Sequence, residues 1–216
     1  HGCLVGSEMC IRDRYSGIEH EVTPGTVLTL KVSTRRAGER ISKWAYEYAR
    51  NAGRRKIHCC HKVPVMPLAD GAFLDAFYRI GEQYPFIEKS DMPMDNLAFS
   101  MAMDPAPFDV LLLQNLYGDI LSDQAAGLVG GLGVVPGANI GDGIAVFEAV
   151  HGTAPDIAGK GIANPLAVLN SALLMLQYVG EHKLAARIER AVFDVLEAGK
   201  VRTGDLGGSA NTAEFT

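Results

Sequence analysis

Apolar and polar positions alternate in the first half of the chain in a way that predicts strands and helices in turn. Residues 15–33 are rich in β-branched side chains around the turn Pro24-Gly25, which predicts a two-stranded hairpin with one apolar face. Helical spacing and short apolar runs distinguish the elements that follow. The predicted helices are 36–51, 70–84 and 97–103, and the predicted strands are 57–60, 87–94 and 110–113. This alternation predicts an α/β fold with a mostly parallel sheet covered on both faces.

The character of the sequence changes at Gly130-Gly131. Two segments of the second half are predicted to be irregular, residues 132–143 and the Gly- and Pro-rich residues 151–165, with a strand at 144–147 between them. Two helices are then expected. The first, 166–179, is apolar nearly all round and should be deeply buried, while the second, 182–198, is amphipathic.

Composition narrows the class of protein. The chain has 216 residues, 48% of them hydrophobic, and a net charge of −5, which describes a globular protein without a nucleic-acid surface. Its apolar runs are too short to span a membrane, and no secretory signal is visible. The four cysteines include the neighbours Cys59 and Cys60 and form no CxxC, which favours a reducing compartment. Residues 1–14 lack any period and are interpreted as a non-native segment.

Asp119 and Asp123 stand at i and i+4 in the stretch NLYGDILSDQAAGLVGG, where Gly118 interrupts the apolar pattern. On a helix this spacing places both carboxylates on one face, where two like charges repel. A hard cation such as Mg²⁺ or Mn²⁺ would relieve the repulsion, because it prefers carboxylate oxygens. The alternative is a solvated acidic start of a helix.

Two further features are candidates for chemistry. Lys62 follows the predicted strand 57–60 in a Pro-interrupted loop, and ligands in α/β folds bind at the carboxyl ends of strands. The alternative is an ordinary surface lysine. Residues 148–165 contain no GxGxxG, yet they suit a nucleotide lying along a loop, with Asp156 accepting from ribose hydroxyls. Here the alternative is a structural loop built from turn residues.

These motifs together resemble the β-decarboxylating dehydrogenases, the isocitrate, homoisocitrate and 3-isopropylmalate dehydrogenases. VFEAVHGTAPDIAGKGIANP and NLYGDILSDQAAGLVGGLG carry the resemblance, and YSGIEHEV, HK, MDN and RTGDLGG agree with it in order. The resemblance implies an incomplete isocitrate/isopropylmalate dehydrogenase-like fold. Residues 15–130 would form a small α/β domain with a hairpin arm, and residues 131–216 part of the large NAD-binding domain.

The resemblance also implies a reaction and a set of roles. A 2-hydroxy tricarboxylic acid would bind Mg²⁺ or Mn²⁺, pass a hydride to NAD and lose CO₂, with the cation as Lewis acid. The metal ligands would be Asp119, Asp123 and Asp95 of a partner subunit. Lys62, also from the partner, would serve the C2 hydroxyl proton, and Tyr15 would protonate the enolate. The implied cofactor-binding residues are Glu148, His151, Gly152, Thr153, Ala154, Asp156, Ile157 and Asn164.

The sequence also departs from the family. The arginine-bearing substrate segment expected before Tyr15 is replaced by EMCIRDR, which predicts a C-terminal fragment, inactive alone. An NAD-dependent isocitrate dehydrogenase acting as a homodimer or larger oligomer is the first interpretation, with homoisocitrate or 3-isopropylmalate dehydrogenase as alternatives. A non-catalytic regulatory subunit is a further alternative. No nucleic acid or membrane partner is expected, and the location would be the cytoplasm, or the mitochondrial matrix in a eukaryote.

Overall fold

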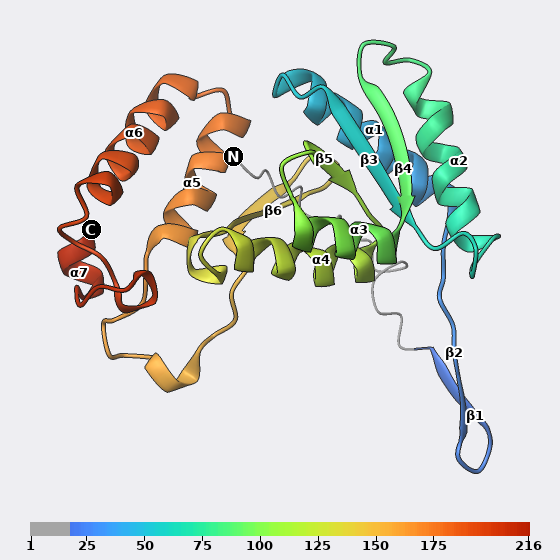
Figure 1. Ribbon diagram of the computed structural model, residues 1–216, viewed down its shortest axis with the longest axis horizontal. Coiled ribbons are helices and arrows are strands. Elements are labelled where there is room, and N and C mark those ends of the chain that lie inside the picture. Colours follow the sequence, from blue (N-terminus) through green and yellow to red (C-terminus); the bar gives the residue numbers. More distant parts are fainter. Residues whose placement is uncertain (1–17) are drawn as a thin grey trace. The chain divides into compact units, whose positions relative to one another are not determined.

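Figure 1 shows the computed structural model, in which residues 18–216 are described. Contacts divide the chain into two compact units, one up to Leu121 and one from Ser122. The division falls within a single helix, α4 (Asn115–Leu128), so that helix belongs to both units. The domain boundary predicted at residues 130 and 131 stays a prediction.

The first unit begins with the predicted hairpin arm. Strands β1 (Glu19–Thr23) and β2 (Thr26–Thr29) pair antiparallel, and every residue of both strands is exposed. Gly25 adopts a φ of +79° in the turn, a conformation that a residue with a Cβ rarely adopts. The Gly25 N–H donates to Glu21 Oε1 at 2.8 Å and closes the turn.

A three-stranded parallel sheet forms the centre of the first unit, in the order β4-β3-β5. Its strands are β3 (Lys56–His61), β4 (Glu88–Pro93) and β5 (Val110–Leu112). The chain passes from β3 through α2 (Ala69–Gly81) to β4 on one side of β3, and from β4 through α3 (Met94–Met103) to β5 on its other side. Because the two connections run in opposite directions along the sheet, right-handed crossovers place α2 and α3 on opposite faces. The predicted parallel sheet is therefore confirmed for this unit.

Helix α1 (Arg35–Asn51) packs beside α2 and closes the core over the sheet (Figure 1). It begins where Thr34 Oγ1 accepts from the Ala37 N–H at 3.3 Å, an N-cap that satisfies a free helix donor. Tyr46 stacks on both Phe77 and Tyr84 in the core, and burial raises its pKa. Cys59 and Cys60 are free thiols buried in β3, as expected for a pair that does not bridge.

The second unit pairs a small sheet with helices. Strands β6 (Pro136–Ile140) and β7 (Ala145–Ala149) are antiparallel, and α5 (Leu166–Tyr178) packs on both. Ser171 of α5 contributes to this contact: its hydroxyl accepts from the Gly137 N–H at 3.3 Å, and its one proton can go to the Glu148 carbonyl at 2.9 Å or to the Ala167 carbonyl at 2.7 Å. The remaining elements are η1 (Leu132–Val134), η2 (Pro155–Ile157), α6 (His182–Ala198), η3 (Gly204–Leu206) and α7 (Thr212–Phe215).

Gly118, where the apolar pattern of the sequence is interrupted, lies within α4, and one glycine costs a helix only about 1 kcal/mol. Two expectations are corrected. Residues 132–143 are not a loop, since η1 and β6 occupy most of them and β6 is held by its ladder to β7. Helix α5 is not buried all round: Val168 and Tyr178 are 59% and 56% exposed. Within the described chain α5 packs on β6, β7 and α6, and these contacts leave part of its apolar surface exposed. No helix within residues 18–216 combines the length and apolar character needed to cross a membrane.

Candidate active site

Chemistry-bearing side chains follow all three strands of the parallel sheet at the edge where the strands end. Lys62 comes directly after β3, Asp95 lies in the first turn of α3 after β4, and Asp119 lies on α4 after β5. The carboxyl ends of parallel strands meet at one edge of a sheet, and this edge is where ligands bind in such folds. The topology therefore explains how residues distant in sequence come to one side of the first unit.

Lys62 and Asp95 are in direct contact. Lys62 Nζ lies 2.5 Å from Asp95 Oδ1, and the ammonium donates to the carboxylate. This hydrogen bond is the main reason that the pKa of Asp95 is lowered. Asp95 is largely exposed, so the pair lies at the surface of the first unit.

Asp70 lies beside this pair and is fully buried. Its Oδ1 accepts from Lys31 Nζ at 2.5 Å, and its Oδ2 accepts from the Lys62 N–H at 2.7 Å. The Lys31 ammonium also stands over the ring of Tyr117, 4.7 Å from its centroid. Burial, the Asp70 charge and a hydrogen bond to Asp70 raise the pKa of Tyr117 to about 12. The Asp70 carboxylate therefore links Lys31 at the end of the arm, the backbone of Lys62, and Tyr117 of α4.

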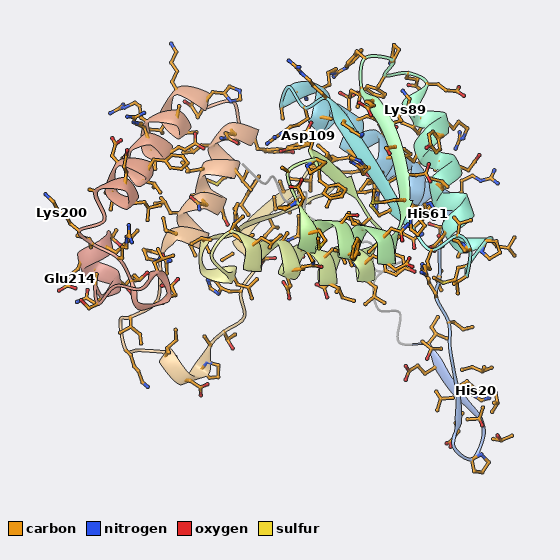
Figure 2. The ribbon with its side chains drawn as sticks, in the orientation of Figure 1. His20, His61, Lys89, Asp109, Lys200 and Glu214 are labelled. Carbon is orange, nitrogen blue, oxygen red and sulfur yellow. The ribbon has the colours of Figure 1, made fainter. Side chains whose placement is uncertain are left out.

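His61, which is labelled in Figure 2, is held in one tautomer by two partners. Its Nδ1 accepts from the Val63 N–H at 3.1 Å, so the proton sits on Nε2, which donates to Asp91 Oδ2 at 3.0 Å. Tyr78 donates to the other oxygen of Asp91, and its pKa is raised to about 12 by burial and by that carboxylate. Burial raises the pKa of Asp91, but hydrogen bonds from Tyr78 and His61 outweigh it and the net shift is downward.

The two helix aspartates fit a hard cation by chemistry. Asp119 and Asp123 are exposed one turn apart on α4 and offer only carboxylate oxygens, the donors that Mg²⁺ and Mn²⁺ prefer. Among residues 18–216, no three His, Cys, Asp or Glu side chains form a group that could hold a metal ion. The structure thus brings Lys62 to Asp95 within the first unit.

The predicted cofactor loop lies in the second unit and is exposed from His151 to Gly161. Its course is set by Ala154, which adopts a left-handed φ of 42° before η2, where Asp156 and Ile157 lie. His151 Nδ1 donates to the Gly152 carbonyl at 2.9 Å, and Thr153 lies in the same exposed stretch. Glu148 on β7 accepts from Asn139 Nδ2 at 2.9 Å.

Asn164 at the end of this loop is held by two hydrogen bonds. Its Oδ1 accepts from the Leu166 N–H at 2.9 Å, and its Nδ2 donates to Asp205 Oδ2 at 2.8 Å. Thr212 adds a second link, since its N–H donates to the Gly161 carbonyl at 2.8 Å and its hydroxyl to the Ala163 carbonyl at 2.6 Å. The C-terminal segment therefore fixes the end of the loop.

Sequence reasoning singled out Lys62 and Asp95 but missed the residues that hold them. Asp70 reads as an ordinary acidic residue in the first turn of a helix, and nothing in its spacing signals a link to Lys31. His61 stands beside Lys62 in the HK pair, which was the available signal. Asp205 lies in the RTGDLGG motif, whose contact with Asn164 spans 41 positions. Tyr15 lies outside the described residues.

Comparison with known proteins gives a consistent family. The sequence profile of the family described as isocitrate/isopropylmalate dehydrogenase matches residues 5–216. The mitochondrial alpha subunit of NAD isocitrate dehydrogenase from Homo sapiens is 50% identical over 203 residues, 94% of this chain and 56% of that protein. Subunit 2 of the same mitochondrial enzyme from Schizosaccharomyces pombe is 48% identical over 205 residues, 94% of this chain and 54% of that protein.

Solved structures agree. Isocitrate dehydrogenase from Methylococcus capsulatus matches with a TM-score of 0.88 and 46% identity, over 94% of this chain and 62% of that one. The protein TT0538 from Thermus thermophilus matches with a TM-score of 0.89 and 46% identity, over 94% of this chain and 42% of that one. The chain spans about half the length of the curated relatives it matches.

Proposed function

Because the chain belongs to the isocitrate/isopropylmalate dehydrogenase family, we propose that it supplies the metal- and cofactor-binding residues of an NAD-dependent isocitrate dehydrogenase. The observation that carries the proposal is the contact of Lys62 Nζ with Asp95 at 2.5 Å. This contact lies at the edge of the sheet where β5, the strand that precedes Asp119, also ends. An amine beside carboxylates can exchange a proton with a substrate hydroxyl. The names of the relatives favour isocitrate over homoisocitrate and 3-isopropylmalate.

The proposed reaction assigns one proton step to each of two side chains. Lys62, as the neutral amine, would take the proton of the C2 hydroxyl, and bound NAD would supply the acceptor for the hydrogen on C2. The bond to the neighbouring carboxylate then breaks and releases CO₂, and Tyr15 delivers a proton to the carbon that remains. Lys62 suits this step because its backbone N–H and its Nζ are both held, so little freedom is lost when substrate binds.

Asp119 and Asp123 would hold Mg²⁺ or Mn²⁺ together with Asp95 of a second chain. A bound divalent cation supplies Lewis-acid polarisation of the substrate's hydroxyl and carboxylate oxygens. Lys62 and Asp95 lie together in the first unit. In a site shared between two chains, each chain would contribute its Lys62–Asp95 pair to one site and its α4 carboxylates to the other.

NAD would lie along residues 148–164, with Asp156 accepting from the adenosine ribose and Ile157 beside it. The remaining loop residues are His151, Gly152, Thr153, Ala154 and Asn164, with Glu148 at the start. An exposed loop whose end is fixed by Asp205 and Thr212 offers backbone groups in a set place, which supports this assignment. The second chain would be an identical copy or a related subunit, since the relatives are named alpha and 2. In a eukaryote the location would be mitochondrial.

The test is isocitrate-dependent NADH formation by a chimera in which residues 15–216 replace the matching part of an active relative. Lys62→Met should lower kcat by about 10²- to 10⁴-fold, the usual contribution of a positioned acid or base. Lys43→Met is the matched control, an exposed lysine on α1. Equal activity of Lys62→Met and the parent would refute the proposed role.

Metal binding is tested separately from activity. Asp123→Asn should weaken Mn²⁺ binding, followed by the relaxation of water protons, because one of its few charged oxygen ligands is lost. Asp142→Asn, which changes an exposed aspartate of the second unit outside α4, is the control. Unchanged Mn²⁺ binding in Asp123→Asn would exclude α4 as the metal-binding element.

A further inference from the structure

Asp70 occupies an unusual position for an acidic residue. It is fully buried, although acidic residues are rarely so unless they are paired. Its place in the first turn of α2 would favour a carboxylate even in water, because helix N-termini attract negative charge. The attraction of the helix N-terminus does not explain why Asp70 is buried, because an exposed carboxylate would be stabilised in the same way without the cost of desolvation. The reason for burial lies in the groups that Asp70 contacts.

The Lys62 N–H is the first backbone donor beyond the end of a strand ladder. The pairing of β3 with β4 ends at His61 and Pro93, and β4 then gives way to α3. The Lys62 N–H instead donates to Asp70 Oδ2 at 2.7 Å. The Lys62 carbonyl accepts from the N–H groups of Val65 and Met66, both at 2.9 Å. Both backbone polar groups of Lys62 are therefore fixed, one of them by a charged acceptor.

The same carboxylate reaches two other segments of the first unit. Lys31, two residues past β2, donates to Oδ1, and Tyr117 of α4 is hydrogen bonded to Asp70. Ser33 adds a contact from the arm side, where its hydroxyl donates to the Ala69 carbonyl at 3.1 Å. Three donors from three segments compensate the burial of one charge. Tyr117 stands two positions before Asp119, so the segment that bears the lysine and the helix that bears the acidic pair share one anchor.

We propose that Asp70 is a positioning residue, whose buried carboxylate holds the backbone of Lys62 and so sets where the Lys62 ammonium lies at the sheet edge. The part of Lys62 in proton transfer rests on the proposed function. A charged, doubly anchored acceptor is suited to this task, because charge-assisted hydrogen bonds are shorter and stronger than neutral ones. A small displacement of a reacting group lowers rate much more than it lowers affinity.

The test compares two variants, of which only one keeps an acceptor at position 70 for the Lys62 N–H. Both carry Lys31→Met, which prevents an unpaired ammonium from being left beside a neutral residue. Asp70→Asn keeps an oxygen that can accept from Lys62, and Asp70→Ala removes it. Asp75→Asn and Asp75→Ala in the same Lys31→Met background are the matched controls, since Asp75 is exposed on the same helix.

Two readouts are used. Exchange of the Lys62 amide hydrogen, measured in the chain itself, should be faster by about tenfold or more in Asp70→Ala than in Asp70→Asn, the effect of one hydrogen bond. In the chimera, kcat at saturating isocitrate, corrected for the folded fraction, should fall by about 10- to 100-fold in Asp70→Ala. KM should change little, and Asp70→Asn should restore kcat toward the Lys31→Met value.

Equal amide exchange in the two Asp70 variants would overturn the proposal, because Asp70 would then not hold Lys62. Equal kcat would overturn it as well, since the contact would then be structural only, and so would a loss of kcat that merely follows the folded fraction. If the parental chimera forms no NADH with isocitrate, the proposed function fails, while the amide exchange still decides whether Asp70 fixes the lysine segment.

Discussion

His58 is a buried imidazole in the middle of β3 with a lowered pKa. Burial is the main cause and the neighbouring charge of Lys56 adds to it, while Glu88 acts in the opposite sense. Its Nδ1 has no hydrogen-bond partner within the described part of the chain, and the edge of the ring meets Phe108. A proton on His58 would therefore place a poorly compensated charge in the sheet.

This makes folding of the first unit sensitive to mild acid. In the unfolded chain His58 binds a proton near pH 6.5, whereas the folded chain binds it only at lower pH. The free energy of unfolding should thus fall as pH drops below about 6.5, with a slope from this one group of at most about 1.4 kcal/mol per pH unit. Urea unfolding between pH 7 and pH 5 measures it. His58→Leu should flatten the slope, and His20→Leu in the exposed arm should not; equal slopes in all three proteins would contradict this reading.

Cofactor choice should depend on Asp156. Its exposed carboxylate lies in η2 next to Ile157, which has no donor for a phosphate. NADP carries a phosphate where NAD has a ribose hydroxyl, and a carboxylate facing it costs on the order of 2–4 kcal/mol. We expect the chimera to prefer NAD by kcat/KM, and Asp156→Lys with Ile157→Tyr to move the preference toward NADP.

The control for that experiment is Asp142→Lys, which introduces the same change of charge at an exposed position outside the loop. A parent that prefers NADP, or a double variant with an unchanged ratio of kcat/KM, would show that Asp156 is not the selector.

The sequence predicts the place of a residue where a local motif contains it, but it does not predict contacts between residues that only the folded chain brings together. Lys62 could be placed because its strand was evident from the run Ile57 to Cys60 and its loop from the prolines. The link between Asp70 and Lys31 spans 39 positions, and a helix and a strand lie between them in the chain. Neither side chain differs from a surface residue in local pattern, so the buried pair could be found only in three dimensions.

At the scale of elements, α2 contains two glycines in opposite situations. Gly71 in its first turn has no atom within 4 Å of where a Cβ would stand, whereas a Cβ on Gly81 would collide with the Tyr46 hydroxyl and come within 2.6 Å of Lys89 Cδ. Lys89 also donates to the Gly81 carbonyl at 3.1 Å, so its side chain is held in place.

These surroundings predict opposite effects of one substitution. Gly71→Ala should stabilise the first unit by about 0.5–1 kcal/mol, because it restricts the unfolded chain without a clash. Gly81→Ala should destabilise it by about 1–3 kcal/mol, because the core must shift around Tyr46. Thermal unfolding of the two variants beside the parent decides this. If both variants shift the midpoint of thermal unfolding in the same direction, the predicted clash at Gly81 is contradicted.

Elements were predicted best where one face had a clear partner. Helix α1 was expected at residues 36–51 and spans Arg35–Asn51, because its apolar stripe packs on α2 and the sheet. Strand β6 was missed because PGANI has no apolar alternation and is held by its ladder to β7 and by Ser171 of α5. The sequence shows that α5 is apolar, but hydrophobicity alone does not reveal whether other segments of the chain cover its surface.

At the scale of the whole molecule, the arm has one apolar face. The pairing places Ile18, His20, Leu28 and Leu30 on one side of the hairpin. The three apolar side chains among them are 46–56% exposed. Glu19, Glu21 and Thr29 lie on the other side, with Val27 as its apolar exception. An isolated two-stranded hairpin is only marginally stable in water, so this arm requires a surface to pack on.

We expect that surface to be a second chain, because the proposed active site also requires Lys62 and Asp95 to act beside the α4 carboxylates of another copy. Leu28→Asp, which places a charge on the apolar face, should weaken self-association by about tenfold or more, as loss of a central apolar contact does at interfaces. Thr29→Asp, the next residue on the opposite face, should leave association near the parental value. Sedimentation equilibrium of the three proteins measures it. A parent that sediments as a monomer at all concentrations, or two variants that associate equally, would show that the arm is not the contact between copies.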